Sequence, residues 1–352
     1  PNFFIHLQIM IRSFVFMFSR LVARISVAAA LIFVAACDDD YFDKSHYEEI
    51  IGRAFPVENV AREHRWTIVD SASVEPLRYC FEDNFPQEGD YDFNDCVLTV
   101  SPTVDGRTVT LRVSLDAVGT VKQIAAAMRV KGVRADDVVP VAVEGDFDTD
   151  RPQASFRIID TDAVLLPPSH RRTDDLVVRL FNDAHWSIGR TLERDGSVRR
   201  HMYNTVGTSA TDSRIPHSAV RPAVAVYTLR CSTEAAAAAF VAGNMDVFII
   251  ENFNGTYMEV HTRMFKTDEV IYHYIASPSD YDDPYIWALQ LPAEFLYPTE
   301  GTAIGTGRNG VFSGAYHTPG HSFAEWAADP VRATDWWQYP SKQMVYPSGR
   351  NR

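Results

Sequence analysis

The chain has 352 residues, of which 46% are hydrophobic and 12% aromatic, and its formal net charge at pH 7 is −13. A chain of this length and hydrophobic content can bury a substantial core, so we expect one or two folded domains and little disorder. The acidic balance argues against a nucleic-acid-binding protein, because nucleic-acid phosphates need a basic face.

The N-terminal segment has the pattern of a secretory signal. A basic stretch from Met17 to Arg24 precedes an apolar run of 12 residues from Ile25 to Ala36, and Cys37 follows directly. An apolar run this short is typical of a signal peptide and not of a membrane span. Small residues followed by a cysteine resemble a bacterial lipobox. We therefore predict a signal peptide over 1–36, of which 1–16 is an over-extended start, and a lipid on Cys37 that binds the protein to a membrane.

Residues 37–65 are charged and mixed in character, and we expect them to form a tether. The run Asp38-Asp39-Asp40 directly after the cysteine resembles the acidic export signal that sends some bacterial lipoproteins to the outer cell surface. The predicted location is therefore the outer membrane with the body exposed on the cell surface, and a periplasm-facing body is the alternative.

The body follows from Trp66, where the hydrophobic pattern takes a period of two. This period predicts strands at 66–69, 78–81, 97–100, 108–115, 154–159, 175–181, 224–229, 246–251 and 258–261. Helical patterning is scarce and predicts helices at 120–128, at 233–242 with Ser232 as a candidate N-cap, and at 323–327. A stretch at 267–284 is expected to be a long loop.

Many short strands with turn residues between them, and no alternation of strands with helices, predict an all-β or mainly β fold. We expect a β-sandwich or jelly-roll-like body with a few short helices. No internal break divides it, so 66–345 is predicted to be a single β domain.

The most informative feature is an acidic motif between two predicted strands. The stretches 81–83 and 89–95 hold five carboxylates and one side-chain amide, and a buried strand follows them. Crowded oxygen ligands suit a hard cation, and repulsion among these like charges is unfavourable without one. We therefore predict a Ca²⁺ site whose candidate ligands are Glu82, Asp83, Asp90, Asp92, Asn94 and Asp95.

The spacing excludes an EF-hand, although Asp90, Asp92 and Asn94 alternate as the first ligands of a calcium loop do. Position 6 would be Asp95 where a Gly is required, and position 12 would be Ser101 where a Glu is required. A different calcium geometry stays open. The alternative is that these side chains cap backbone N–H groups and only shape a turn.

This motif also resembles a known family. Phe81-Glu82-Asp83, followed by Gly89-Asp90-Tyr91-Asp92-Phe93-Asn94-Asp95, is similar to the signature of the LruC-domain family, which comprises bacterial lipoprotein domains of uncharacterised function. Further similar stretches follow in order at 180–185, 203–205, 259–261, 287–292, 297–300, 323–326 and 335–337. The resemblance covers about 66–340 and implies an extracytoplasmic β-rich module without implying an activity.

Three cysteines follow Cys37, so at least one thiol stays unpaired. Cys80 and Cys96 flank the acidic motif, and Cys231 lies far from them in the sequence. A bridge between the first two would hold the acidic loop closed. Buried free thiols are the favoured alternative.

Two classes of function compete. The first is a non-catalytic binding or structural module, stabilised by Ca²⁺, whose ligand is a glycan or a protein of the envelope or the host. The second is a hydrolase of extracellular glycans that uses paired carboxylates. The sequence holds no G-x-S-x-G and no H-E-x-x-H motif, which favours the first class, although carboxylate hydrolases need neither. A third alternative is a subunit of a surface assembly.

Overall fold

The computed structural model describes residues 67–85, 89–147, 158–159, 161–166, 174–206, 217–253, 256–262, 286–305 and 313–346. All of them belong to one compact unit of the chain. The predicted signal peptide, Cys37, the tether and the predicted loop at 267–284 lie outside the described residues, as does most of the predicted strand at 154–159.

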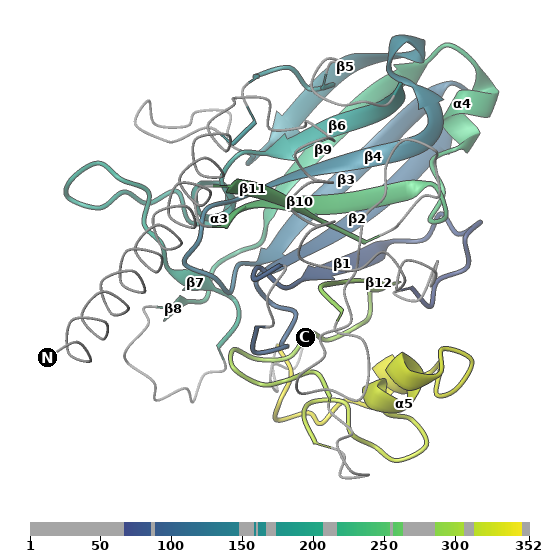
Figure 1. Cartoon of the computed structure of the whole chain (residues 1–352). Helices are drawn as coiled ribbons and strands as arrows, with labels where there is room; N and C mark the ends of the chain where they lie inside the picture. Colours follow the sequence, from purple (N-terminus) through teal and green to yellow (C-terminus); the bar gives the residue numbers. More distant parts are fainter. Residues whose placement is uncertain are drawn as a thin grey trace, which may run out of the picture. The chain divides into compact units, whose positions relative to one another are not determined.

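The described chain is mainly β, which confirms the predicted fold class. One antiparallel sheet has six strands in the order β12-β1-β2-β3-β9-β5, and a second has four in the order β11-β10-β4-β6 (Figure 1). Two short strands, β7 and β8, form a small parallel pair. The strands are β1 (Leu77–Phe81), β2 (Cys96–Asp105), β3 (Thr108–Ala117), β4 (Ile124–Arg134), β5 (Val138–Gly145), β6 (Asp175–Phe181), β7 (Met202–Tyr203), β8 (His217–Ser218), β9 (Ala223–Cys231), β10 (Met245–Phe253), β11 (Thr256–His261) and β12 (Ala288–Pro292).

The two sheets share one buried hydrophobic core, as in a β-sandwich. Side chains alternate along β3 between buried and less buried positions, as the predicted strand at 108–115 requires. Leu98 of β2 lies opposite Leu115 of β3 in the register, and both are fully buried. Tyr227 of β9 donates a hydrogen bond from its hydroxyl to the carbonyl of Leu180 in β6, at 3.0 Å, which links the six-stranded sheet to the four-stranded one.

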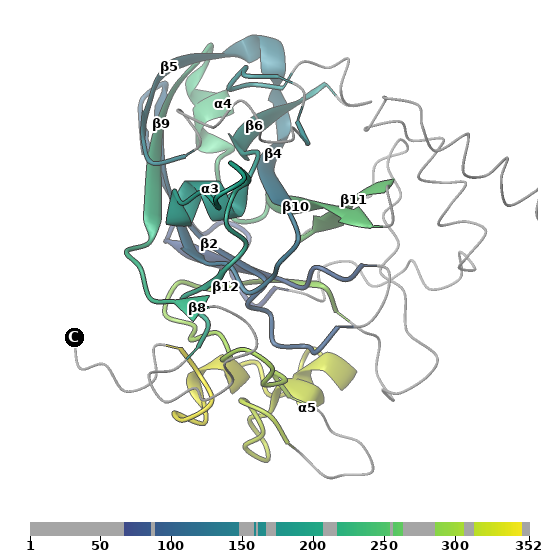
Figure 2. The ribbon, with the colours of Figure 1, turned by 90° about the vertical axis from the view of Figure 1, so that its left-hand side faces the viewer.

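The helices are few and short: α3 (Ala184–Gly189), α4 (Glu234–Ala238) and α5 (Phe323–Ala328), with single 3₁₀ turns at η2 (Ala135–Asp137) and η5 (Trp336–Gln338). Helix α3 packs against β3 and β4. In Figure 2 the helix lies between β9 on the left and β10 on the right. Helix α4 begins after Thr233, whose hydroxyl accepts from the Ala236 amide at 3.1 Å, so the N-cap is Thr233 and not Ser232. No described helix is long and apolar enough to cross a membrane.

The predicted helix at 120–128 is wrong. Its second half is the start of strand β4, where Ala125, Ala126 and Ala127 are fully buried and β4 pairs with β10 on one side and β6 on the other. Alanine favours a helix in isolation, but tertiary packing overrides that weak preference. The predicted strand at 66–69 is also reduced, since among its described residues only Thr67 pairs, through an isolated bridge to Gln290.

The C-terminal part of the chain supplies an aromatic cluster that packs beside the acidic motif. Its members are Phe295, Tyr316, Phe323, Trp326 and Trp336, whose ring centroids lie 4.9 to 5.8 Å apart in five contacting pairs. Tyr91 of the acidic motif contacts Phe323 edge to face at 5.7 Å. The motif is therefore held between the ends of β1 and β2 and this cluster.

Candidate metal centre

Glu82 is the anchor of the acidic loop, defined here as the connection from Glu82 to Asp95. It directly follows β1 and is fully buried. Its carboxylate accepts hydrogen bonds from the backbone amides of Tyr91 at 3.1 Å and Phe93 at 2.7 Å. Tyr91 and Phe93 have φ values of 66° and 55°, in the left-handed region that non-glycine residues rarely adopt. The loop backbone therefore curls around one carboxylate.

Asp92 is the second buried acid of the loop. Its Oδ1 accepts from the Asn94 amide at 3.1 Å, which closes an Asx turn. Its Oδ2 accepts from the Gly301 amide at 2.8 Å. One carboxylate thus shapes the loop locally and joins it to a segment that is distant in the sequence.

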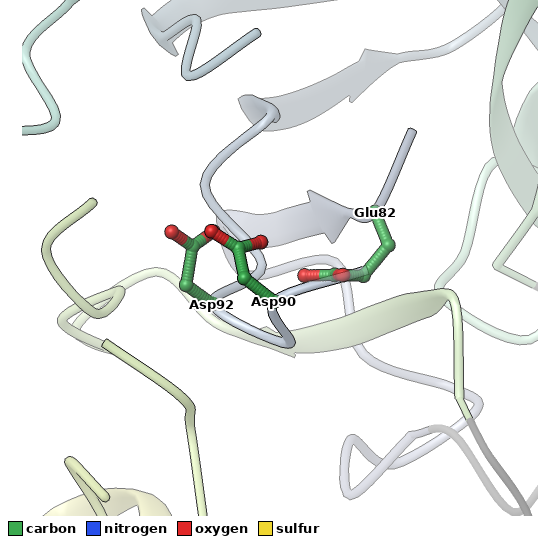
Figure 3. Close-up of side chains that lie close together, drawn as sticks. All are labelled: Glu82, Asp90 and Asp92. Atoms are coloured by element: carbon green, nitrogen blue, oxygen red, sulfur yellow. The ribbon is translucent and has the colours of Figure 1, made fainter. Parts of the chain in front are cut away.

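Three of the six predicted ligands gather into a carboxylate cluster. One oxygen each from Glu82, Asp90 and Asp92 lies within 4.8 Å of the other two, with Asp90 exposed and the others buried. The carboxylates of Asp90 and Asp92 lie side by side, and that of Glu82 points toward them (Figure 3). Burial, together with repulsion from Asp90 and Glu82, raises the pKa of Asp92 well above its usual range. Such a cluster favours either a proton or a cation between its members.

Asp83 and Asp95 are engaged outside this cluster. Asp95 accepts from the Asp83 amide at 2.8 Å. The Asp83 carboxylate accepts from the Thr120 hydroxyl and lies 3.3 Å from the Lys122 ammonium. Lys122 also lies 3.2 Å from the carboxylate of the fully buried Glu251 in β10. The lysine therefore serves as the counter-ion of Asp83 and Glu251.

Asn94, the sixth predicted ligand, lies in close contact with Gly119. Its side chain is fully buried, and its Nδ2 donates to the Pro298 carbonyl at 3.3 Å. Its Oδ1 has no hydrogen-bond partner. A Cβ at position 119 would lie 1.8 Å from that oxygen, so only glycine fits at Gly119.

Sequence reasoning missed Glu300, which joins the electrostatic environment of the cluster from the segment after β12. Burial and repulsion from Asp90, Glu82 and Asp83 raise its pKa to about 8. In the sequence, its stretch 297–300 stands out only through its similarity to a family block. The sequence carries no signal that places a residue 200 positions away beside the acidic loop.

A second polar group next to the site is built around His185 in α3. Its Nε2 lies 2.7 Å from the Thr120 carbonyl, and its Nδ1 lies 3.0 Å from an Arg200 nitrogen. Arg200 also forms two hydrogen bonds, of 2.9 and 2.8 Å, with Asp183. Burial and the neighbouring Arg200 lower the pKa of His185 to about 3, so the ring is neutral. This histidine positions the turn that contains Thr120.

The cysteines that flank the loop are free. Cys80 pairs with Val97 in the register of β1 and β2, whereas Cys96 pairs with Phe81. Successive residues of a strand point to opposite faces, so the two sulfurs lie on opposite sides of the sheet. Cys80, Cys96 and Cys231 are all buried free thiols, and the alternative of a Cys80–Cys96 bridge is wrong.

Fold and site together define a mainly β protein with a carboxylate cluster in the loop between the neighbouring strands β1 and β2 of its larger sheet. The sequence model of a domain of unknown function, DUF4842, matches residues 107–337, and the chain belongs to this family. The more specific LruC assignment stays a prediction. A crystal structure described as a "putative lipoprotein from Bacteroides ovatus" is similar, with a TM-score of 0.44 and 14% identity over 78% of this chain and 76% of that chain. No curated protein matches the chain.

Proposed function

We propose that this protein is a lipid-anchored envelope protein whose β body is a non-catalytic binding or structural module with Ca²⁺ bound at the acidic loop. The observation that supports the metal most strongly is the gathering of Glu82, Asp90 and Asp92 within 4.8 Å, with two of them buried. Ca²⁺ takes about six to eight oxygen ligands and tolerates irregular geometry, so these carboxylates suit it as part of a ligand set.

The turn-forming alternative is compatible with this metal. Glu82 and Asp92 each accept backbone amides, which explains how the loop folds. Each carboxylate oxygen has two lone pairs, so an oxygen that accepts an amide can still face a cation. Asp90 is different, because it brings a third charge toward two buried acids, and burial with repulsion from Asp83 raises its pKa. A bound cation would balance the charge of Asp90, whereas the turn is formed by Glu82 and Asp92 without it.

The contacts of the gathered acids favour a module over a glycan hydrolase. A carboxylate hydrolase places two carboxyl groups about 5 Å or more apart on either side of the scissile bond. Glu82 and Asp92 instead accept hydrogen bonds from backbone amides of their own loop, and Asp83 forms an ion pair with Lys122. These contacts support a role in holding the protein's own backbone.

The lipid anchor rests on Cys37 and the preceding apolar run. We propose a body that faces outward from the outer membrane, where a glycan or an envelope or host protein is its ligand; a periplasmic face and a surface assembly are the alternatives. Radioactive palmitate should label the protein in cells but not a Cys37→Ala variant. Protease added to intact cells should then remove the body only if it is surface-exposed.

Thermal unfolding tests the calcium site. The protein with Cys37→Ser, which cannot be lipidated, is heated in EDTA and in millimolar Ca²⁺. A site with a Kd of ~10⁻⁴–10⁻³ M predicts a rise in Tm of several degrees at saturating Ca²⁺. Asp90→Asn should abolish the rise, and Asp105→Asn, at an exposed carboxylate outside the site, should keep it. Equal Tm values in EDTA and Ca²⁺ for the Cys37→Ser protein would refute the proposal.

A further inference from the structure

We propose that this protein has a second cation site, apart from the carboxylate cluster, which its own Lys122 ammonium fills in place of a metal ion. Four oxygens surround the ammonium nitrogen and are called the lysine cage here: the carbonyl and Oδ1 of Asp83, Oδ1 of Asn84 and Oε2 of Glu251. The inference goes beyond the proposed function, because none of these oxygens comes from the carboxylate cluster.

The oxygens of the lysine cage lie around the nitrogen as ligands lie around a bound cation. Nζ is 2.5 Å from the Asp83 carbonyl, 2.9 Å from Asn84 Oδ1 and 3.2 Å from Glu251 Oε2. Asp83 Oδ1 is 3.3 Å away. A lysine ammonium has three N–H donors, so it cannot give each of the four oxygens a hydrogen bond of its own. Carboxylate, amide and carbonyl oxygens are also the groups that bind Ca²⁺ in proteins.

Glu251 shows that the ammonium leaves part of the cage unsatisfied. Its side chain is fully buried, and its Oε2 contacts Lys122. Its Oε1 is also buried and has no hydrogen-bond partner among the described residues. Native proteins rarely leave a buried charged oxygen in this state, because its desolvation is then uncompensated. The carboxylates of Asp83 and Glu251 face a single ammonium, and a divalent ion would balance both charges.

The turn that carries Lys122 fixes the ammonium in the cage. The Lys122 amide donates to the Thr120 hydroxyl at 2.9 Å, and this hydroxyl donates to the Asp83 carboxylate. His185 holds the same turn, since its Nε2 lies 2.7 Å from the Thr120 carbonyl. The lysine side chain is 29% exposed, whereas Glu251 is fully buried, so solvent reaches the cage from the side of the lysine. An ion can therefore enter the cage when this side chain is shortened.

The lysine cage joins the two sheets. Asp83 and Asn84 follow β1 of the six-stranded sheet, and Glu251 lies in β10 of the four-stranded sheet. Lys122 lies in the connection from β3 to β4, which runs between the same two sheets. A metal ion in the cage would make this junction depend on Ca²⁺, whereas the lysine keeps it closed at any Ca²⁺ concentration. The carboxylate cluster can then gain and lose its ion without opening the sandwich.

Calcium titration of matched variants tests the lysine cage. In the Cys37→Ser protein, Lys122→Ala removes the ammonium and leaves its place open. Calorimetry should show one more bound Ca²⁺ per chain in Lys122→Ala than in the parent, and Ca²⁺ should raise its Tm by several degrees more. Lys342→Ala, at an exposed lysine, should bind Ca²⁺ as the parent does. Adding Glu251→Gln to Lys122→Ala should remove the extra ion, because a buried ligand charge is gone.

The outcomes separate this site from the acidic loop. If the parent binds no Ca²⁺ and Lys122→Ala binds one ion, the calcium site of the proposed function fails and the lysine cage stands. If Lys122→Ala binds no more Ca²⁺ than the parent and gains no more in Tm, the cage is not a cation site. If Lys122→Ala is unfolded in EDTA, Ca²⁺ should restore its near-ultraviolet circular dichroism, and a failure to do so also overturns the inference.

Discussion

Asp92 accepts a hydrogen bond from the backbone amide of Gly301, 209 residues later in the chain, at 2.8 Å. The same carboxylate closes the turn at Asn94, so its two oxygens serve two different parts of the fold. The conformation of the acidic loop therefore depends on the segment after β12, and neither part of the chain can build the site alone.

The first prediction concerns this carboxylate. Asp92→Ala should lower the free energy of unfolding by about 2–4 kcal/mol, because it leaves two amides without an acceptor. Asp92→Asn keeps one acceptor oxygen and removes a repelling charge, so its loss should be smaller. Urea unfolding in EDTA measures both. Equal stability of Asp92→Ala and the parent protein would show that the two hydrogen bonds contribute nothing.

The second prediction concerns Lys122. Lys122→Met should lower the free energy of unfolding by about 2–3 kcal/mol. Removing one partner of a fully buried ion pair lowers it by ~3–5 kcal/mol, and the loss is smaller here because the lysine side chain is 29% exposed. The cost arises because Glu251 is left as a buried charge without a counter-ion. Glu251→Gln in the Lys122→Met background should restore at least ~1 kcal/mol. A double-mutant cycle by urea unfolding checks this, and additive losses would contradict the coupling.

The third prediction is a pH dependence from His261 in β11. Burial alone would lower its pKa, but the carboxylates of Asp246 and Glu259, 2.6 and 2.8 Å from its ring nitrogens, outweigh burial and raise it. Because the pKa is raised in the folded state, protonated His261 stabilises the fold. This stabilisation is complete below the unfolded pKa of 6.5 and is lost as pH rises through the folded pKa.

The titration of His261 should therefore lower stability above neutral pH by at most about 1.4 kcal/mol per pH unit, the slope for one proton, and Glu300, whose pKa is raised to about 8, adds to this fall. His261→Gln should make that limb less steep. The acid limb should remain, because His185, with a pKa of about 3, is neutral in the fold and takes up a proton only on unfolding below pH 6.5. Urea unfolding from pH 4 to 9 measures both limbs. An unchanged alkaline limb in His261→Gln would assign it to another group.

The fourth prediction concerns the buried thiols. Burial raises the pKa of Cys80 and Cys96, so neither forms the reactive thiolate in the folded state. Both should resist a thiol reagent in native buffer and react in denaturant, which peptide mapping by mass spectrometry would resolve. Oxidising and reducing buffers should give the same Tm. A Cys80–Cys96 bridged peptide would contradict the register of β1 and β2.

A strand whose apolar and polar residues alternate can be predicted from the sequence, because the alternation itself shows which face of the strand is buried. The strand predicted at 108–115 lies within β3, whose burial alternates in this way. The strand predicted at 175–181 coincides with β6, although Val177 and Val178 are both buried and its burial does not alternate. Strand β5 was missed: it is an edge strand with Val139 and Val141 exposed and Pro140 between them, so its residues do not alternate in the expected way. The sequence predicts a helix over 120–128, which includes the start of β4. Pairing with β10 and β6 on its two sides decides the conformation of β4, and its alanines do not.

The same distinction applies to the candidate site, of which one part could be predicted from the sequence and another part could not. The sequence alone predicted the acidic motif, its place beside a buried strand and its oxygen-rich character, because these depend on residues close together in the chain. Only the tertiary structure separated Glu82, Asp90 and Asp92 from Asp83, which Lys122 engages, and brought Glu300 and Gly301 to the loop. Electrostatic pairing and hydrogen bonding depend on distances in space, and chain folding alone sets those distances for residues far apart in sequence.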